Sequence, residues 1–202
     1  MKIISDKYTI YGRKKGRKKI HSVYKEFFVN CKINLETDIK INKKNIIDVG
    51  SGKGESTLFL AKKNPDALII AIEIFLDGNI DLCKQLSKLK LHNVKIFSSN
   101  VLKLFDHLNK DDFFNEIWIL FPDPWPKKKH YKRRLINDNF FTKVYPYLKK
   151  NGRIFIATDS SSYLKSIMNS IYKTKYLFNW LNNKPQNWIY EMLDLLCTKF
   201  FK

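Results

Sequence analysis

The chain has 202 residues, of which 44% are hydrophobic and 14% aromatic, and it carries 38 lysines and arginines against 19 acidic residues. This length and this apolar content suit one domain with a buried core, and they argue against a disordered chain. The formal net charge of +19 indicates a polyanionic partner, although a lysine-rich genomic composition would account for part of it.

Residues 1–44 are expected to form a basic arm and a short helical or irregular lead-in. Arg13 and Arg17 belong to a basic run that extends to Lys19, and a second basic run covers residues 127–134. Because the positive charge is concentrated in two short stretches, composition alone is a poor explanation for it, and nucleic acid is the favoured partner.

From residue 46 onward, apolar runs of strand length alternate with helical stretches. We expect strands at 46–49, 68–72, 94–98, 117–121 and 153–157, and helices near 55–63, 78–90, 134–148 and 160–173. This alternation predicts an α/β fold with a doubly wound, mostly parallel sheet. With no internal repeat and no linker, residues 45–202 are expected to be one domain.

The first expected strand runs into a glycine-rich turn that contains Gly50 and Gly52, and Asp48 lies just before it. Glu73 ends the second expected strand, where a carboxylate can accept hydrogen bonds from both hydroxyls of a ribose. The spacing differs from the dinucleotide fingerprint, and the turn by itself has a purely structural explanation. Together with Glu73, it indicates a nucleoside-binding site, and Asp48 would favour a cationic ligand.

The fourth expected strand ends in a stiff loop that contains Pro122, Pro124 and Pro126. Asp123 lies between two of these prolines, and the basic run of residues 127–134 follows. In an open α/β sheet, ligands bind at this carboxyl edge. Asp123 could be a simple turn former, but that would leave the basic run unexplained. For Trp125, stacking on a base and packing within the protein both remain open.

The segment 122–130, followed by residues 132–135, resembles the signature of the tRNA (guanine-N7)-methyltransferase family. The likeness extends to the arm at 11–17, the turn at 48–55, Glu73 and Thr158-Asp159, so it covers most of the chain from residue 11 onward. The resemblance implies a Rossmann-like fold of the class I methyltransferase type, S-adenosylmethionine as cofactor, and methyl transfer to N7 of a guanine in tRNA.

The resemblance also implies roles for particular residues. The cofactor-binding positions are Asp48, Gly50, Gly52, Glu73, Asn100 and Asp123. Asp123 is also the expected catalytic residue, close to the reacting methyl group. The substrate nucleotide is expected near Lys127, Asp159 and Thr198. The RNA-binding positions are Lys128, Lys129, His130, Tyr131, Lys132, Arg133 and Arg134, together with Arg13 and Arg17 in the arm.

The chain departs from the family near its end, where Phe201 replaces the glutamate of the family's C-terminal motif. An enzyme that is weakened or depends on a partner therefore remains an alternative, as does an RNA-binding subunit without turnover. A methyltransferase of another substrate class on the same fold is a third alternative. Homodimer formation and an accessory subunit are both open.

The remaining sequence features concern metals and location. Cys31, Cys83 and Cys197 lie far apart in the sequence, and the four histidines are scattered, so we expect neither a disulfide framework nor a metal site. No apolar stretch has the length of a transmembrane helix, and the N-terminus shows no signal peptide. We expect a cytoplasmic protein that does not bind membranes.

Overall fold

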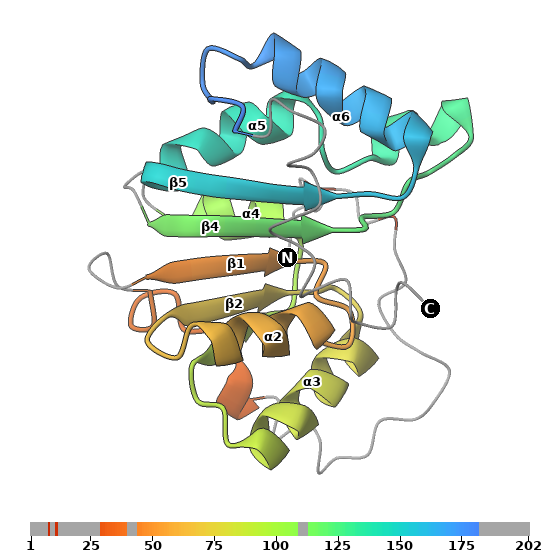
Figure 1. Ribbon diagram of the computed structural model, residues 1–202. Coiled ribbons are helices and arrows are strands. Elements are labelled where there is room, and N and C mark those ends of the chain that lie inside the picture. Colours follow the sequence, from red (N-terminus) through yellow and green to blue (C-terminus); the bar gives the residue numbers. More distant parts are fainter. Residues whose placement is uncertain (1–7, 9–10, 12–28, 40–43, 109–112, 182–202) are drawn as a thin grey trace, which may run out of the picture.

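The computed structural model of the protein describes residues 8, 11, 29–39, 44–108 and 113–181. Its centre is a parallel sheet with the strand order β3-β2-β1-β4-β5. The strands are β1 (Asn45–Val49), β2 (Leu68–Ile72), β3 (Val94–Phe97), β4 (Phe114–Leu120) and β5 (Leu148–Ala157). The labelled strands in Figure 1 point the same way, as the expected doubly wound fold requires.

Helices connect the strands and cover both faces of the sheet. They are α2 (Glu55–Lys63), α3 (Leu76–Leu89), α4 (Val101–His107), α5 (Asp138–Val144) and α6 (Ser161–Lys173). Two 3-10 helices, η1 (Lys128–Arg133) and η2 (Tyr145–Tyr147), lie on either side of α5 in the chain. Each consecutive pair of parallel strands is thus joined by a crossover containing at least one helix.

Two apolar clusters form the core, one on each face of the sheet. Ile47 and Val49 of β1 pack with α4, α5 and α6, whereas Ile46 packs with α2 and α3. Every residue of β1 is buried. This follows from the pleat, because successive side chains point to opposite faces and helices cover both faces of a parallel sheet.

The predicted fold class is confirmed, with two differences in the helices. Residues 101–107 form α4, a helix that is absent from the predicted ones. The predicted helix at 134–148 is wrong at both ends. Asn137 caps α5 by accepting a hydrogen bond from the Phe140 amide (3.0 Å), and residues 145–147 form a 3-10 turn before β5. Pro146 cannot donate the backbone hydrogen bond that a continued α-helix needs.

The described part of the lead-in packs against the domain. The Ile33 amide donates to the Ile96 carbonyl of β3 (3.0 Å), and Ile33 and Ile39 are buried in the core. Cys31 packs against Cys83 of α3, far away in the sequence, and both cysteines are free thiols. A thiol hydrogen bond with Cys83 lowers the pKa of Cys31 to about 7.

Candidate functional site

The candidate site lies where the strand order of the sheet reverses. β1 lies between β2 and β4, and the loops after these strands leave the sheet at the same carboxyl edge. The glycine turn follows β1, Glu73 follows β2, the proline loop of residues 121–127 follows β4, and Asp159 follows β5. A doubly wound sheet binds its ligands at this switch point, so the fold brings together segments that are distant in the sequence.

The glycine turn depends on left-handed backbone conformations. The φ angles of Gly50, Gly52 and Gly54 are 75°, 56° and 91°, a region that residues with a Cβ rarely adopt. The Gly50 amide donates to the Ile72 carbonyl of β2 (2.8 Å), which ties the turn to the sheet. Apart from the two adjoining residues, no atom of the described part of the chain lies within 4 Å of the Cβ position at Gly50 or Gly52, so the space beside the turn is open to a ligand.

Glu73 holds the glycine turn from the neighbouring strand. Its Oε2 accepts a hydrogen bond from the Gly52 amide (3.0 Å), and its Oε1 accepts one from the Phe75 amide (2.8 Å). A carboxylate can accept about four hydrogen bonds, so both oxygens retain capacity for ribose hydroxyls. The geometry is compatible with the expected ribose contact, which remains a prediction.

Asp48 is 1% exposed and lies beneath the turn. Its Oδ2 accepts hydrogen bonds from the hydroxyls of Ser56 and Thr57, both at 2.6 Å. Burial raises the pKa of Asp48, and these two hydrogen bonds oppose the shift because they favour the charged form. The carboxylate therefore joins β1 to the first turn of α2, a contact that sequence analysis did not predict.

Asn100 has a clear structural role in addition to its expected one. It is the N-cap of α4, and its Oδ1 accepts a hydrogen bond from the Leu102 amide (2.9 Å). An Asn or Asp side chain is well suited to this position because it satisfies an amide that has no partner within the helix. The predicted adenine contact remains untested.

The proline loop presents Asp123 in an exposed position at the carboxyl edge. The backbone of the loop is strained at Phe121, where the loop begins, and at Trp125, because the φ angles of these residues are 49° and 43°. The Trp125 ring lies 4.9 Å from the Arg133 guanidinium and 6.1 Å from the Tyr11 ring. In this structure the Trp125 ring packs within the protein, and the alternative of stacking on a base is untested.

The basic run begins at Lys127 and continues along η1, where its side chains differ in exposure. The exposed ones are Lys127, Lys128, Lys129, Tyr131 and Lys132, whereas His130 and Arg133 are half-buried. Arg134 is only 3% exposed and donates hydrogen bonds to Pro124 and Ser162. Arg134 was expected to bind RNA along with its neighbours. In the structure, however, its guanidinium donates its hydrogen bonds to acceptors within the protein.

The remaining predicted residues fall in two groups. Asp159 is exposed at the carboxyl edge, just before Ser160, which caps α6. Arg13, Arg17, Thr198 and Phe201 lie outside the described residues. Gly78 on α3 also adjoins the turn and was not predicted from the sequence: a Cβ there would lie 2.2 Å from the Gly52 carbonyl oxygen. A glycine near the start of a helix that follows Glu73 was the available signal.

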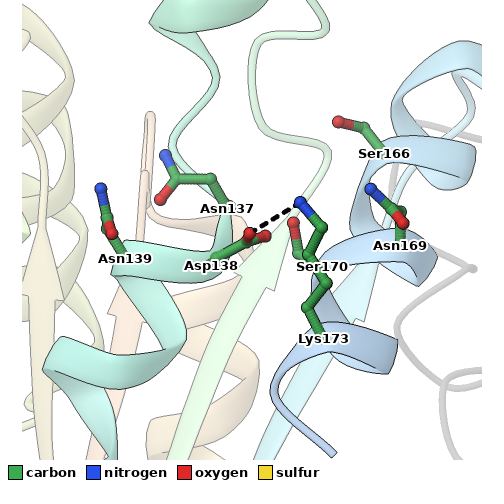
Figure 2. Close-up of a pocket in the computed structure, with 7 residues that line it drawn as sticks. All are labelled: Asn137, Asp138, Asn139, Ser166, Asn169, Ser170 and Lys173. Carbon is green, nitrogen blue, oxygen red and sulfur yellow. Dashed lines mark hydrogen bonds and ion pairs between the residues drawn. The ribbon is translucent and has the colours of Figure 1, made fainter.

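A polar hollow of about 290 Å³ lies elsewhere, between the first turn of α5 and the second half of α6 (Figure 2). Lys173 and Asp138 form an ion pair at its rim (3.0 Å). Since α6 leads away from the carboxyl edge, this hollow is separate from the candidate site. Within the described ranges, no cluster of His, Cys, Asp and Glu is suited to a metal ion, and no helix could cross a membrane.

Comparisons with known proteins agree with the geometry. A sequence family described as "Putative methyltransferase" matches residues 42–194. A tRNA (guanine-N(7)-)-methyltransferase of Mycoplasmopsis pulmonis is 33% identical, over 71% of this chain and 74% of that protein. One of Buchnera aphidicola is 32% identical, over 78% of this chain and 64% of that protein. The chain thus spans less than two thirds of the Buchnera relative.

Among solved structures, precorrin-6y C5,15-methyltransferase from Geobacter metallireducens superposes with a TM-score of 0.52 at 14% identity. The match covers 76% of this chain and 70% of that protein. At this identity, the likeness concerns the fold alone.

Proposed function

The chain belongs to the tRNA (guanine-N7-)-methyltransferase family, and from this premise we propose that it transfers a methyl group from S-adenosylmethionine to N7 of a guanine in tRNA. The supporting observation is that Asp123 is exposed on the loop after β4, and that β4 pairs with β1, the strand that leads into the nucleoside-type turn. The enzyme acts in the cytoplasm, with tRNA as its partner.

The site has the features that a sulfonium nucleoside requires. Open space lies beside Gly50 and Gly52, and the Glu73 carboxylate adjoins the same turn. Asp48, Asn100 and Asp123 complete the proposed cofactor site. When bound, S-adenosylmethionine supplies an electrophilic methyl group. The carboxylates of Asp48, Glu73 and Asp123 favour this cationic ligand by their charge.

The proposed chemistry needs no general base. Guanine N7 has an in-plane lone pair and no proton at neutral pH, so the protein accelerates transfer by holding the nucleophile in line with the methyl group. Asp159 or Asp123 holds the guanine, because its N1–H and amino group match the two oxygens of a carboxylate. Lys127, which is in the same proline loop as Asp123, is also proposed to contact the substrate nucleotide.

The exposed part of the basic run provides the RNA surface. Lys128, Lys129 and Lys132 contact phosphates, which position the tRNA without reading its sequence. Because N7 is hidden in the deep, narrow major groove of an RNA helix, the target guanine must be in a loop or turned outward. This requirement favours a folded RNA over a regular duplex as substrate.

The test is methyl transfer from labelled S-adenosylmethionine to unmodified tRNA, followed by cleavage at N7-methylguanine to locate the product. We expect one labelled, cleavable guanine per tRNA. Asp123→Ala should lower the rate by roughly 100-fold or more, because positioning provides most of the catalysis. Asp66→Ala is the matched control, since Asp66 is an exposed aspartate that precedes β2 at the opposite edge of the sheet.

The alternative functions predict other results. An RNA-binding subunit without turnover would bind tRNA but neither bind nor consume S-adenosylmethionine. A methyltransferase of another substrate class would bind the cofactor and leave tRNA unlabelled. Full activity of Asp123→Ala would show that the catalytic assignment is wrong.

A further inference from the structure

Arg134 ends the basic run, but its guanidinium connects two parts of the protein. Its Nε donates to the carbonyl oxygen of Pro124 in the proline loop (2.8 Å). Its Nη1 and Nη2 donate to the carbonyl oxygen and the hydroxyl of Ser162 in the first turn of α6 (3.1 and 2.8 Å). One planar side chain thus bridges the loop after β4 and the helix after β5.

Aromatic rings fix the plane of this guanidinium. Its central carbon lies 3.7 Å from the centre of the Tyr131 ring and 4.8 Å from that of the Tyr163 ring. Tyr163 is fully buried, and its hydroxyl accepts a hydrogen bond from the Ile136 amide (2.9 Å). Burial raises the pKa of Tyr163 to about 12, with a small contribution from the nearby Asp123 charge. A phosphate could engage Arg134 only after these contacts were broken.

The proline loop depends on hydrogen bonds from residues outside the loop, such as the one that Arg134 donates to Pro124. Its three prolines lack amide hydrogens, so the segment can donate few hydrogen bonds of its own. At its start, the Phe121 amide donates to the Ala157 carbonyl of β5 (2.8 Å). Farther along, the Pro124 carbonyl is held by Arg134.

We propose that Arg134 is a positioning residue that sets the separation between Asp123 and Asp159. Pro124 directly follows Asp123 in the chain, and Ser162 lies in the helical turn that begins just after Asp159. One of these two exposed carboxylates is proposed to hold the guanine, and Asp123 also belongs to the proposed cofactor site, so the inference rests on the proposed function. Arg134 would thereby act on the rate of transfer, whereas its exposed neighbours would act on the affinity for tRNA.

The experiment compares Arg134→Met and Arg134→Lys with the wild type, and Lys165→Met is the charge-matched control on the exposed side of α6. For Arg134→Met, we expect kcat to fall on the order of 100-fold, as for other displacements of reacting groups by about 1 Å. The tRNA Kd and its salt dependence should stay at the wild-type values. The kcat of Arg134→Lys should lie between those of Arg134→Met and the wild type, because an ammonium group lacks the planar arrangement of donors that a guanidinium has. Lys165→Met should behave as the wild type.

A phosphate contact gives the opposite pattern and would overturn the proposal. In that case, the salt slope of tRNA binding would shrink by roughly 0.7 for Arg134→Met and stay close to the wild type for Arg134→Lys, which keeps the charge, while kcat at saturating tRNA would not change. Should Arg134→Met not fold, Ser162→Ala takes its place, because it retains the arginine and removes a single acceptor. We expect a several-fold loss of kcat for Ser162→Ala, and unchanged kcat in both Ser162→Ala and Arg134→Lys would also overturn the proposal.

A second readout is independent of methyl transfer. Trypsin cleavage after Lys127, Lys128 and Lys129, followed by mass spectrometry, reports how firmly the loop is held. We expect faster cleavage in the Arg134 variants than in the wild type and in Lys165→Met. If the wild type transferred no methyl group but cleavage increased as expected, the proposed function would fail and the anchoring of the loop would stand. Unchanged cleavage would contradict the anchoring itself.

Discussion

Asp48 places a carboxylate in the interior of the protein. The hydrogen bonds from the hydroxyls of Ser56 and Thr57 only partly offset the free-energy cost of removing this carboxylate from water. Its raised pKa means that the native state holds this proton more tightly than the unfolded chain does. Its contribution to stability is therefore most favourable at acid pH, and it is lost as the pH rises through the raised pKa.

We therefore predict that Asp48→Asn raises the Tm at pH 8 and weakens S-adenosylmethionine binding. The amide carries no charge to desolvate, and the hydroxyls of Ser56 and Thr57 can rotate to suit it. The Tm difference from the wild type should shrink as the pH falls, because protonated Asp48 resembles asparagine. Thermal melts across pH and calorimetric cofactor titrations measure the two effects. A Tm difference that is constant with pH would contradict the prediction.

Gly78 allows α3 to approach the glycine turn closely. A methyl group here would lie 2.2 Å from the Gly52 carbonyl oxygen, so Gly78→Ala must push the turn or the helix aside. We predict a loss of about 1–3 kcal/mol in the free energy of unfolding, typical of overpacking, together with weaker S-adenosylmethionine binding.

Urea denaturation and cofactor titration test this, with Ser87→Ala as control because Ser87 is an exposed position of the same helix. Equal behaviour of the two variants would show that the contact is relieved at no cost.

The places of the motif residues in the fold were predictable from the sequence, and the contacts of residues that act through packing were not. The glycine turn, Glu73 and Asp123 each follow an expected strand, which places them at the carboxyl edge, and their ligand contacts stay predictions. Arg134 shares a basic run with exposed lysines, and only the fold shows that its guanidinium points to Pro124 and Ser162. Burial depends on elements that are distant in the chain, so a local charge pattern cannot reveal it.

Among the elements, α4 shows how a short helix escapes detection. It has seven residues, fewer than a helical hydrophobic pattern needs to become evident, and its main local signal is the cap at Asn100. Strands β1 and β2 were easier to predict, because they are apolar runs covered on both faces by helices. Strands β4 and β5 begin earlier than expected, at Phe114 and Leu148. α5 was predicted too long at both ends, since its start is set by the side-chain hydrogen bond of Asn137 and its end by the 3-10 turn at residues 145–147.

The two roles of Asn100 can be separated by experiment. Asn100→Ala should cost about 1 kcal/mol of stability through loss of the cap, whereas Asn100→Ser should retain most of it. If Asn100 also contacts the adenine, both variants should weaken S-adenosylmethionine binding, because serine lacks the amide group. Denaturation and cofactor titration distinguish these effects. Wild-type cofactor affinity in Asn100→Ser would leave the residue with its structural role alone.

At the scale of the whole molecule, the positive charge should act mainly through the carboxyl edge. We predict that the double variant Lys128→Met/Lys129→Met reduces the salt slope of tRNA binding by about 1.4, at roughly 0.7 for each phosphate contact on single-stranded RNA. The control is Lys62→Met/Lys88→Met, which removes the same charge from the last turns of α2 and α3.

Binding measured by filter retention at several salt concentrations gives both slopes. A control that lost as much slope as the test variant would indicate attraction by the net charge of +19 rather than a defined surface.

The alternation of prolines in the loop after β4 determines which methods can follow its motion. Between Pro122 and Pro126, the backbone has amide hydrogens only at Asp123 and Trp125. Hydrogen–deuterium exchange and amide relaxation measurements will therefore give very little signal from the segment that carries the proposed catalytic carboxylate. The Trp125 indole, packed against Arg133, is the natural spectroscopic probe of this part of the protein.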